Sequence, residues 1–194
     1  QEALLSYDQA IQMDPNNAKY HNNKGIALND LGKYQGAILC YDQAIQLNPN
    51  NEKYHSNKGT ALQELGKYQE AILCYDQAIQ INCNNEDYHY NKGLALKQLG
   101  KHQEALLCYD QAIQINPKHA DNHSSKGNAL RNLGKYQEAI LCYDRAIQIN
   151  RNNGDYHHNK AIALSDLGKD QEAILCSDQA IQINPNDASY HSNK

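Results

Sequence analysis

The chain has 194 residues and a formal net charge of −4, from 18 basic and 22 acidic side chains. This acidic balance argues against a nucleic acid partner. No apolar run approaches the ~20 residues that span a bilayer, so no membrane partner is expected either. The chain has neither Trp nor Phe, so its core must be built from Ile, Leu, Ala and 14 Tyr.

The sequence repeats with a period of 34 residues, and the pair Leu-Gly marks each copy, at 31–32, 65–66, 99–100, 133–134 and 167–168. We therefore predict one array over 1–194. Full repeats run over 18–51, 52–85, 86–119, 120–153 and 154–187, after the second half of a repeat at 1–17 and before the start of a further repeat at 188–194. Stacked arrays need capped ends, and neither end shows a cap. We expect either a piece of a longer array or ends that pair with other copies.

Each repeat predicts two helices. Counting Ala18, Glu52, Glu86, Ala120 and Gly154 as position 1, the first helix covers positions 1–14, with apolar residues at positions 3, 10, 11 and 14. Gly at position 15 supplies a left-handed cap. The second helix covers positions 18–31, with one apolar face. The segment Asn-Pro-Asn-Asn ends it and offers an Asn cap to the next helix.

The repeat "YHSNKGTALQELGKYQEAILCYDQAIQINCNN" resembles a tetratricopeptide repeat. It has small residues at positions 8, 20 and 27, aromatic residues at 17 and 24, and most copies have Pro at 32. The resemblance covers the whole chain and implies an all-α fold, an α-solenoid of antiparallel helix pairs in a right-handed superhelix. It also implies a concave groove that binds peptide. The chain departs from the family in having His at position 4, where Trp is favoured, and Lys at position 7, where Leu is favoured.

Histidine, cysteine and lysine recur at fixed positions. Equivalent atoms of stacked repeats lie on the order of 10 Å apart, which is too far for two ligands of one zinc ion. We therefore interpret the position-4 histidines as half-buried packing residues. Lys at position 7 lies in an apolar stripe, so its ammonium must reach solvent or meet a carboxylate such as the position-25 Asp. The position-4 histidines are His21, His55, His89, His123, His157 and His191.

Five of the six cysteines lie at position 23, and we interpret them as small buried thiols of a reducing compartment. This favours a cytoplasmic location, and an extracellular one stays open because the ends look incomplete. A glycosylation sequon occurs at Asn122. No catalytic or phosphate-binding motif is present, so we expect no enzymatic activity, cofactor or metal.

Differences between repeats gather at positions 2, 5, 9, 12 and 13, on one stripe of the first helix. Neutral drift is the alternative, but drift does not explain the clustering. We predict a concave groove that binds an extended peptide, with Asn at position 6 pairing with its backbone. The predicted groove residues are Asn23, Asn57, Asn91 and Asn159 (position 6), Asn22, Ser56, Tyr90, Ser124 and His158 (position 5), Thr60 and Asn128 (position 9), and Lys97 and Arg131 (position 12).

Leucine at position 22 lies among polar side chains of the second helix. A row of such leucines predicts a self-association stripe, here called the outer leucine stripe: Leu39, Leu73, Leu107, Leu141 and Leu175. Two functions therefore stay open. One is a non-catalytic scaffold that binds a protein or peptide partner. The other is a structural protomer of an open-ended, self-assembling fibre or long superhelical array, joined end to end.

Overall fold

The computed structural model describes residues 2–191, and within this range the chain forms α-helices and no strand. This confirms the all-α prediction. Asn193 and Lys194, which continue the position-6 and position-7 series, lie outside the described residues, and so does the side chain of His191.

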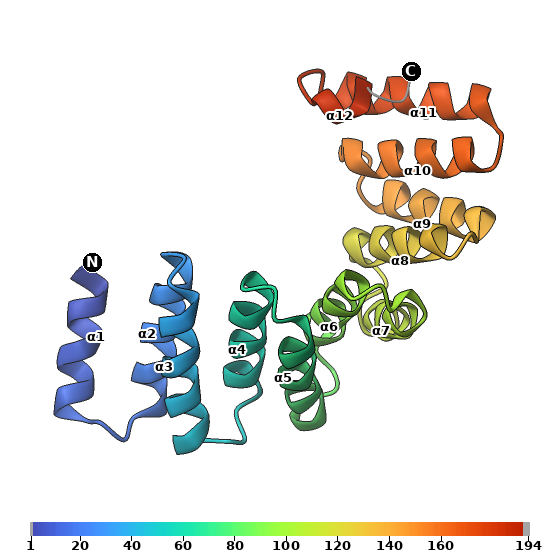
Figure 1. Cartoon of the computed structure of the whole chain (residues 1–194). Helices are drawn as coiled ribbons and strands as arrows, with labels where there is room; N and C mark the ends of the chain where they lie inside the picture. The colour runs from blue at the N-terminus through green and yellow to red at the C-terminus, as the bar shows by residue number, and fades with distance from the viewer. Residues whose placement is uncertain (1, 192–194) are drawn as a thin grey trace. The chain divides into compact units, whose positions relative to one another are not determined.

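The chain divides into two compact units, Gln1–Leu99 and Gly100–Lys194, which are described separately. Within each unit, consecutive helices pack as antiparallel pairs, as predicted (Figure 1). The first unit contains α1 (Glu2–Met13), α2 (Ala18–Asp30), α3 (Tyr34–Leu47), α4 (Glu52–Glu64), α5 (Tyr68–Ile81) and α6 (Glu86–Gln98). The second contains α7 (His102–Ile115), α8 (Ala120–Asn132), α9 (Tyr136–Ile149), α10 (Gly154–Asp166), α11 (Asp170–Ile183) and α12 (Ala188–His191).

The helix ends have the predicted chemistry. Gly66, which follows α4, has φ +72°, a left-handed conformation that costs glycine little. Asn51 caps α4 by accepting a hydrogen bond from the backbone N–H of Lys53 at 3.1 Å. At the start of α8 the cap residue is His119, whose side chain makes no capping bond. Local sequence therefore sets the end of each first helix and the start of most of them, whereas the second helices begin after a lysine that makes no side-chain capping bond.

In three helix pairs, α2–α3, α4–α5 and α8–α9, the core is a tyrosine ring packed on a glycine. Tyr75 of α5 is fully buried, and a Cβ atom placed on Gly59 of α4 would lie only 2.8 Å from its Cε1 atom. Gly25 with Tyr41 and Gly127 with Tyr143 repeat this arrangement. Position 8 is small because the ring of position 24 occupies the space that a methyl group would need.

An ion pair joins each repeat to the one before it. The Nζ atom of Lys58 in α4 lies 2.6 Å from Oδ1 of Asp42 in α3. This confirms the position-25 carboxylate as the partner of the position-7 lysine. A half-buried ammonium is thereby matched by a charge-assisted hydrogen bond. The other pairs are Lys24–Asp8, Lys92–Asp76, Lys126–Asp110 and Lys160–Asp144, at 2.5 to 2.6 Å.

The position-4 histidines form a second link between repeats. The Nε2 atom of His55 donates a hydrogen bond to the carbonyl oxygen of Pro49, in the loop before α4, at 2.8 Å. His21, His89 and His123 bond in the same way to the carbonyl oxygens of Pro15, Cys83 and Pro117. Among residues 2–191, no three His, Cys, Asp or Glu side chains are grouped so that they could hold a metal ion.

Candidate binding surface

A hollow of about 450 Å³ lies in the first unit, along the successive first helices α2, α4 and α6. Of the predicted groove residues, it brings together Asn22, Ser56, Asn57, Thr60 and Asn91. The remaining lining residues are Ile26, Lys53, Tyr54, Asn85, Asp87 and Tyr88. We call this site the α2–α4–α6 hollow.

Asparagine side chains in and beside this hollow bond to one another, and one of these bonds crosses the repeat boundary. The Nδ2 atom of Asn57 donates to Oδ1 of Asn22 at 2.9 Å, and Nδ2 of Asn22 donates to Oδ1 of Asn23 at 3.3 Å. The bonded chain orients each amide, so Asn57 keeps its oxygen available as an acceptor and Asn23 keeps N–H donors. Asn57 therefore presents a hydrogen-bond acceptor, and Asn23, one repeat earlier, presents hydrogen-bond donors.

Asn22, Ser56 and Thr60, from positions 5 and 9, form the floor of the hollow. Asn22 and Ser56 are each only 8% exposed. Thr60 donates to the backbone oxygen of Ser56 at 3.2 Å, and its Oγ1 lies 3.4 Å from the hydroxyl of Tyr75. Burial raises the pKa of Tyr75 to about 12, so its hydroxyl stays protonated. The floor is thus a neutral, hydrogen-bonded surface held by the core.

The sequence prediction missed the part of the wall that tyrosines form. Tyr54 and Tyr88, at position 3, are 4% exposed, and the periodicity placed them in the core, yet both also line the hollow. Lys53 and Asp87, at position 2, give its rim one charge of each sign. Position 2 belongs to the variable stripe from which the groove was predicted. Asn23, Tyr90 and Lys97 belong to the same helices but do not line this hollow.

The remaining predicted groove residues lie on α8 and α10 of the second unit. Ser124 is buried, and Asn128 accepts a hydrogen bond from the hydroxyl of Tyr143 at 2.8 Å. The ring of His158 lies 5.2 Å from that of Tyr190. Several of these side chains therefore already have partners inside the second unit. Arg131 and Asn159 are half-buried.

The hydroxyls of position-3 tyrosines orient carboxylates in the second unit. Tyr156 donates to Oδ1 of Asp121 at 2.6 Å, and Tyr190 donates to Oδ1 of Asp155 at 2.7 Å. In both cases the aspartate comes from position 2 of the preceding repeat. In the second unit, the stripe of variable positions on the first helices therefore includes aspartates whose orientation is fixed by a tyrosine hydroxyl.

The outer leucine stripe is exposed, as its helical phase predicts. The five leucines at position 22 keep 60 to 68% of their surface accessible. Each unit thus presents a regular row of aliphatic side chains on its second helices.

Other predicted features have simple structural outcomes. None of the six cysteines, all of which lie within residues 2–191, forms a disulfide. Of the position-23 thiols predicted to be buried, Cys108 and Cys176 are buried, but Cys40, Cys74 and Cys142 are only half-buried; Cys83 is exposed. Asn122 is fully buried, so its sequon cannot be reached in the folded chain. Among the described helices, none is both long and apolar enough to cross a membrane.

Comparisons with known proteins agree with this architecture. A TPR repeat model matches residues 25–66 and 59–100. Two tetratricopeptide repeat models match residues 86–119 and 120–153, and residues 6–38 and 142–174. No curated protein sequence matches the chain.

Several solved structures share the fold. YrrB, described as a TPR protein with an unusual peptide-binding site, is 21% identical with a TM-score of 0.79, over 95% of each chain. MamA 41-end from Desulfovibrio magneticus RS-1 is 18% identical with a TM-score of 0.82, over 88% of this chain and 97% of that one. The APC/C hetero-tetramer Cut9-Hcn1 is 18% identical with a TM-score of 0.79, over 99% of this chain and 38% of that one.

Proposed function

The chain belongs to the tetratricopeptide repeat family, and from this premise we propose that it is a non-catalytic scaffold that holds an extended peptide in the α2–α4–α6 hollow. The observation that carries the proposal is the convergence of five predicted groove residues on one polar hollow of about 450 Å³. YrrB, which shares the fold, is described as having a peptide-binding site.

The asparagines supply the chemistry that an extended backbone needs. Each residue of such a backbone offers one N–H donor and one carbonyl acceptor. The oxygen of Asn57 can accept from a peptide N–H, since its Nδ2 is bonded to Asn22. The side chain of Asn91 lines the hollow, and its amide can serve as both donor and acceptor.

The rim of the hollow would select side chains. Lys53 and Asp87 place opposite charges on neighbouring repeats, so a peptide with an acidic and a basic residue at matching spacing would pair with both. Ile26 and the edges of the two tyrosines add apolar contact. Because the neutral floor has no charge preference, backbone pairing supplies affinity and the rim supplies specificity.

The proposal is tested by selecting peptides from a random displayed library on the purified chain and measuring binding by calorimetry. We expect Asn91→Ala to weaken a selected peptide at least tenfold, because it removes a donor and an acceptor from the hollow. Asn152→Ala is the matched control, since Asn152 lies in an exposed loop of the second unit. Equal affinity of the Asn91→Ala chain and the parent would contradict the proposal.

The exposure of the outer leucine stripe favours a second candidate function, a protomer of an open-ended fibre. Heterologous contacts that do not close generate such assemblies. Light scattering should then increase steadily with concentration, and Leu73→Asp with Leu107→Asp should suppress the increase. A chain that stops at a defined small size at high concentration would exclude this candidate.

A further inference from the structure

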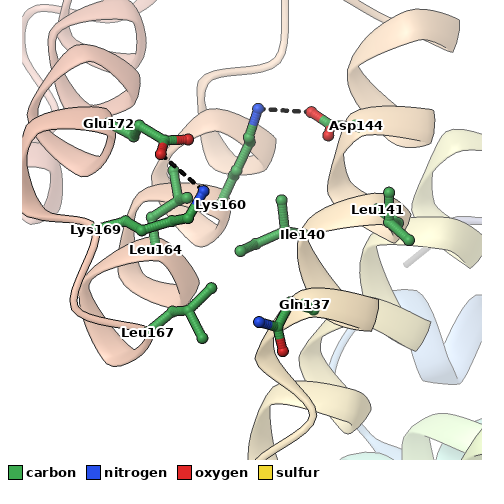
Figure 2. A pocket seen from close by; sticks show the side chains of 9 residues that line it. All are labelled: Gln137, Ile140, Leu141, Asp144, Lys160, Leu164, Leu167, Lys169 and Glu172. Atoms are coloured by element: carbon green, nitrogen blue, oxygen red, sulfur yellow. Dashed lines mark hydrogen bonds and ion pairs between the residues drawn. The ribbon is translucent and has the colours of Figure 1, made fainter.

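A second hollow, of about 360 Å³, lies in the second unit between α9, α10 and the start of α11 (Figure 2). Its floor is aliphatic, and Figure 2 shows the side chain of Ile140 extending into the gap between α9 and α10. We call it the α9–α10 hollow. Its lining residues are Gln137, Ile140, Leu141, Asp144, Lys160, Leu164, Leu167, Lys169 and Glu172.

The lining residues alone do not explain this hollow, because the same nine residue types recur in the first unit. There, Ile38 corresponds to Ile140 and is buried, whereas Ile140 is only half-buried. Each residue of the first unit lies 102 positions before its counterpart, as Leu62 does for Leu164 and Leu65 does for Leu167.

The difference lies in the second helix behind the junction. Where α5 has the buried ring of Tyr75, α11 has Ser177, and where α5 begins with Tyr68, α11 begins with Asp170. The packing around α11 is looser as a result: Ala173 retains 8% exposure, whereas Ala71 retains none. The hollow therefore belongs to a repeat that has lost its large side chains.

The charges at the rim select an uncharged occupant. Nζ of Lys160 lies 2.6 Å from Oδ1 of Asp144, and Nζ of Lys169 lies 2.8 Å from Oε1 of Glu172 (Figure 2). The two pairs leave the rim without net charge, and Leu164 and Leu167 complete the aliphatic wall. An aliphatic side chain fits this floor, because its burial there removes apolar surface from water.

The chain itself presents such side chains. Leu141 is 68% exposed and stands on the rim of the hollow. We propose that the α9–α10 hollow receives Leu141 of a second copy, in a closed two-fold dimer. Because Leu141 lies beside its own hollow, a two-fold axis next to it places each copy's Leu141 over the other's hollow. An isologous contact of this kind closes after two copies.

The charges around the contact are self-complementary. Each copy brings Lys169 and Glu172 to the edge of the hollow, so the ammonium of one copy can meet the carboxylate of the other. The contact is small and partly polar, which is typical of weak, concentration-dependent association. It differs from the fibre both in its stoichiometry and in using one leucine of the outer leucine stripe rather than the whole row.

The dimer is tested by sedimentation velocity of the full chain between micromolar and millimolar concentrations. We expect a monomer–dimer equilibrium that Leu141→Asp weakens at least tenfold. Leu39→Asp is the matched control, since Leu39 is also well exposed, at 61%, but adjoins the buried Ile38. It should leave the equilibrium unchanged. Ile140→Phe, which fills the hollow from within, should weaken the dimer while Leu141 stays in place. Circular dichroism verifies that each variant is folded.

Three outcomes would overturn this proposal: a monomer at all concentrations, equal effects of Leu141→Asp and Leu39→Asp, or growth beyond two copies. The test is independent of the peptide site. Leu141→Asp lies in the second unit and should retain peptide affinity, so failure of one proposal does not imply failure of the other.

Discussion

A Cβ atom placed on Gly127 would lie 2.7 Å from Cε1 of Tyr143, so each of these residues dictates the size of the other. The last full repeat changes both positions together, to Ala161 and Ser177. Ser177 is 1% exposed and its hydroxyl has no hydrogen-bond partner. In this repeat alanine replaces the glycine at position 8, and a serine with a buried hydroxyl replaces the tyrosine at position 24.

We predict strong coupling between these two positions. Ser177→Tyr alone should destabilise the chain, because the ring would meet the methyl group of Ala161. Ala161→Gly alone should cost about 1 kcal/mol through helix propensity. The double variant should regain the packing of the other repeats, with a coupling energy of roughly 1–3 kcal/mol. Urea unfolding of the four chains measures it.

The mirror experiment in the first unit provides the control. Gly59→Ala should be destabilising by itself, because its methyl group would contact the ring of Tyr75, and Tyr75→Ser should relieve that clash. If the effects of the single substitutions were strictly additive in both double-mutant cycles, the tyrosine ring would have moved to make room, and the match in size would not contribute to stability.

The ion pairs between repeats predict an asymmetric response to mutation. Lys58 is 26% exposed and Asp42 is 43% exposed at the side chain. Burial is the largest influence on the pKa of Lys58 and lowers it. The hydrogen bond to Asp42, together with the negative charge of Asp42 and smaller contributions from Cys74 and Glu70, outweighs burial, so the net pKa shift is upward. Asp42→Asn should therefore cost about 1 kcal/mol, because it leaves a half-buried ammonium without its carboxylate. Lys58→Leu should cost less, since Asp42 can be solvated and an aliphatic side chain suits the stripe.

Thermal unfolding of Asp42→Asn, Lys58→Leu and the double variant distinguishes the two effects. The double variant should be no less stable than Asp42→Asn alone. If Lys58→Leu proved the more damaging single change, the ammonium would have a larger role than its exposure indicates.

The sequence was sufficient where the determining contacts are local, and insufficient where they cross between repeats. The periodicity of apolar residues and the caps at Gly66 and Asn51 depend on residues close together in the sequence, and all were predictable. The bond between Lys58 and Asp42 was predictable because a charge in an apolar stripe needs a partner. The bonds from His55 to Pro49 and from Asn57 to Asn22 were not, because they depend on how neighbouring repeats are aligned.

Histidine burial predicts a pH dependence of stability. Burial lowers the pKa of His157 below its usual 6.5. The folded chain therefore binds this proton less readily than the unfolded chain, and the free energy of unfolding should fall as pH drops from about 6.5 through the lower pKa of the folded state. Above pH 6.5 His157 is neutral in both states, so its contribution to the free energy of unfolding should be fully present. His157→Gln should show a weaker decline in stability over this range.

The measurement is a set of urea unfolding curves at several pH values, with an NMR titration of the His157 ring. A ring that titrates at or above 6.5 in the folded chain would contradict the prediction. So would an identical pH dependence of stability in the parent and the His157→Gln chain.

Asn122 predicts a stabilising substitution. Its side chain is fully buried and neither amide atom has a hydrogen-bond partner, whereas the other described repeats have Tyr at this position. A buried amide without partners costs roughly 1–3 kcal/mol. Asn122→Leu, which has a similar size and no polar atoms, should therefore raise the free energy of unfolding by about 1 kcal/mol or more. Asn122→Asp should lower it, because a charge would be buried.

The matched control is Asn128→Leu on the same helix. Asn128 accepts the hydrogen bond from Tyr143, so this variant should destabilise the chain by leaving a buried hydroxyl without its acceptor. Urea unfolding should show that Asn122→Leu raises the free energy of unfolding and that Asn128→Leu lowers it. This difference in sign would show that the effect depends on whether the amide has a hydrogen-bond partner. If both variants were destabilising, the Asn122 cavity would have to be specific for the shape of the amide, and the prediction would fail.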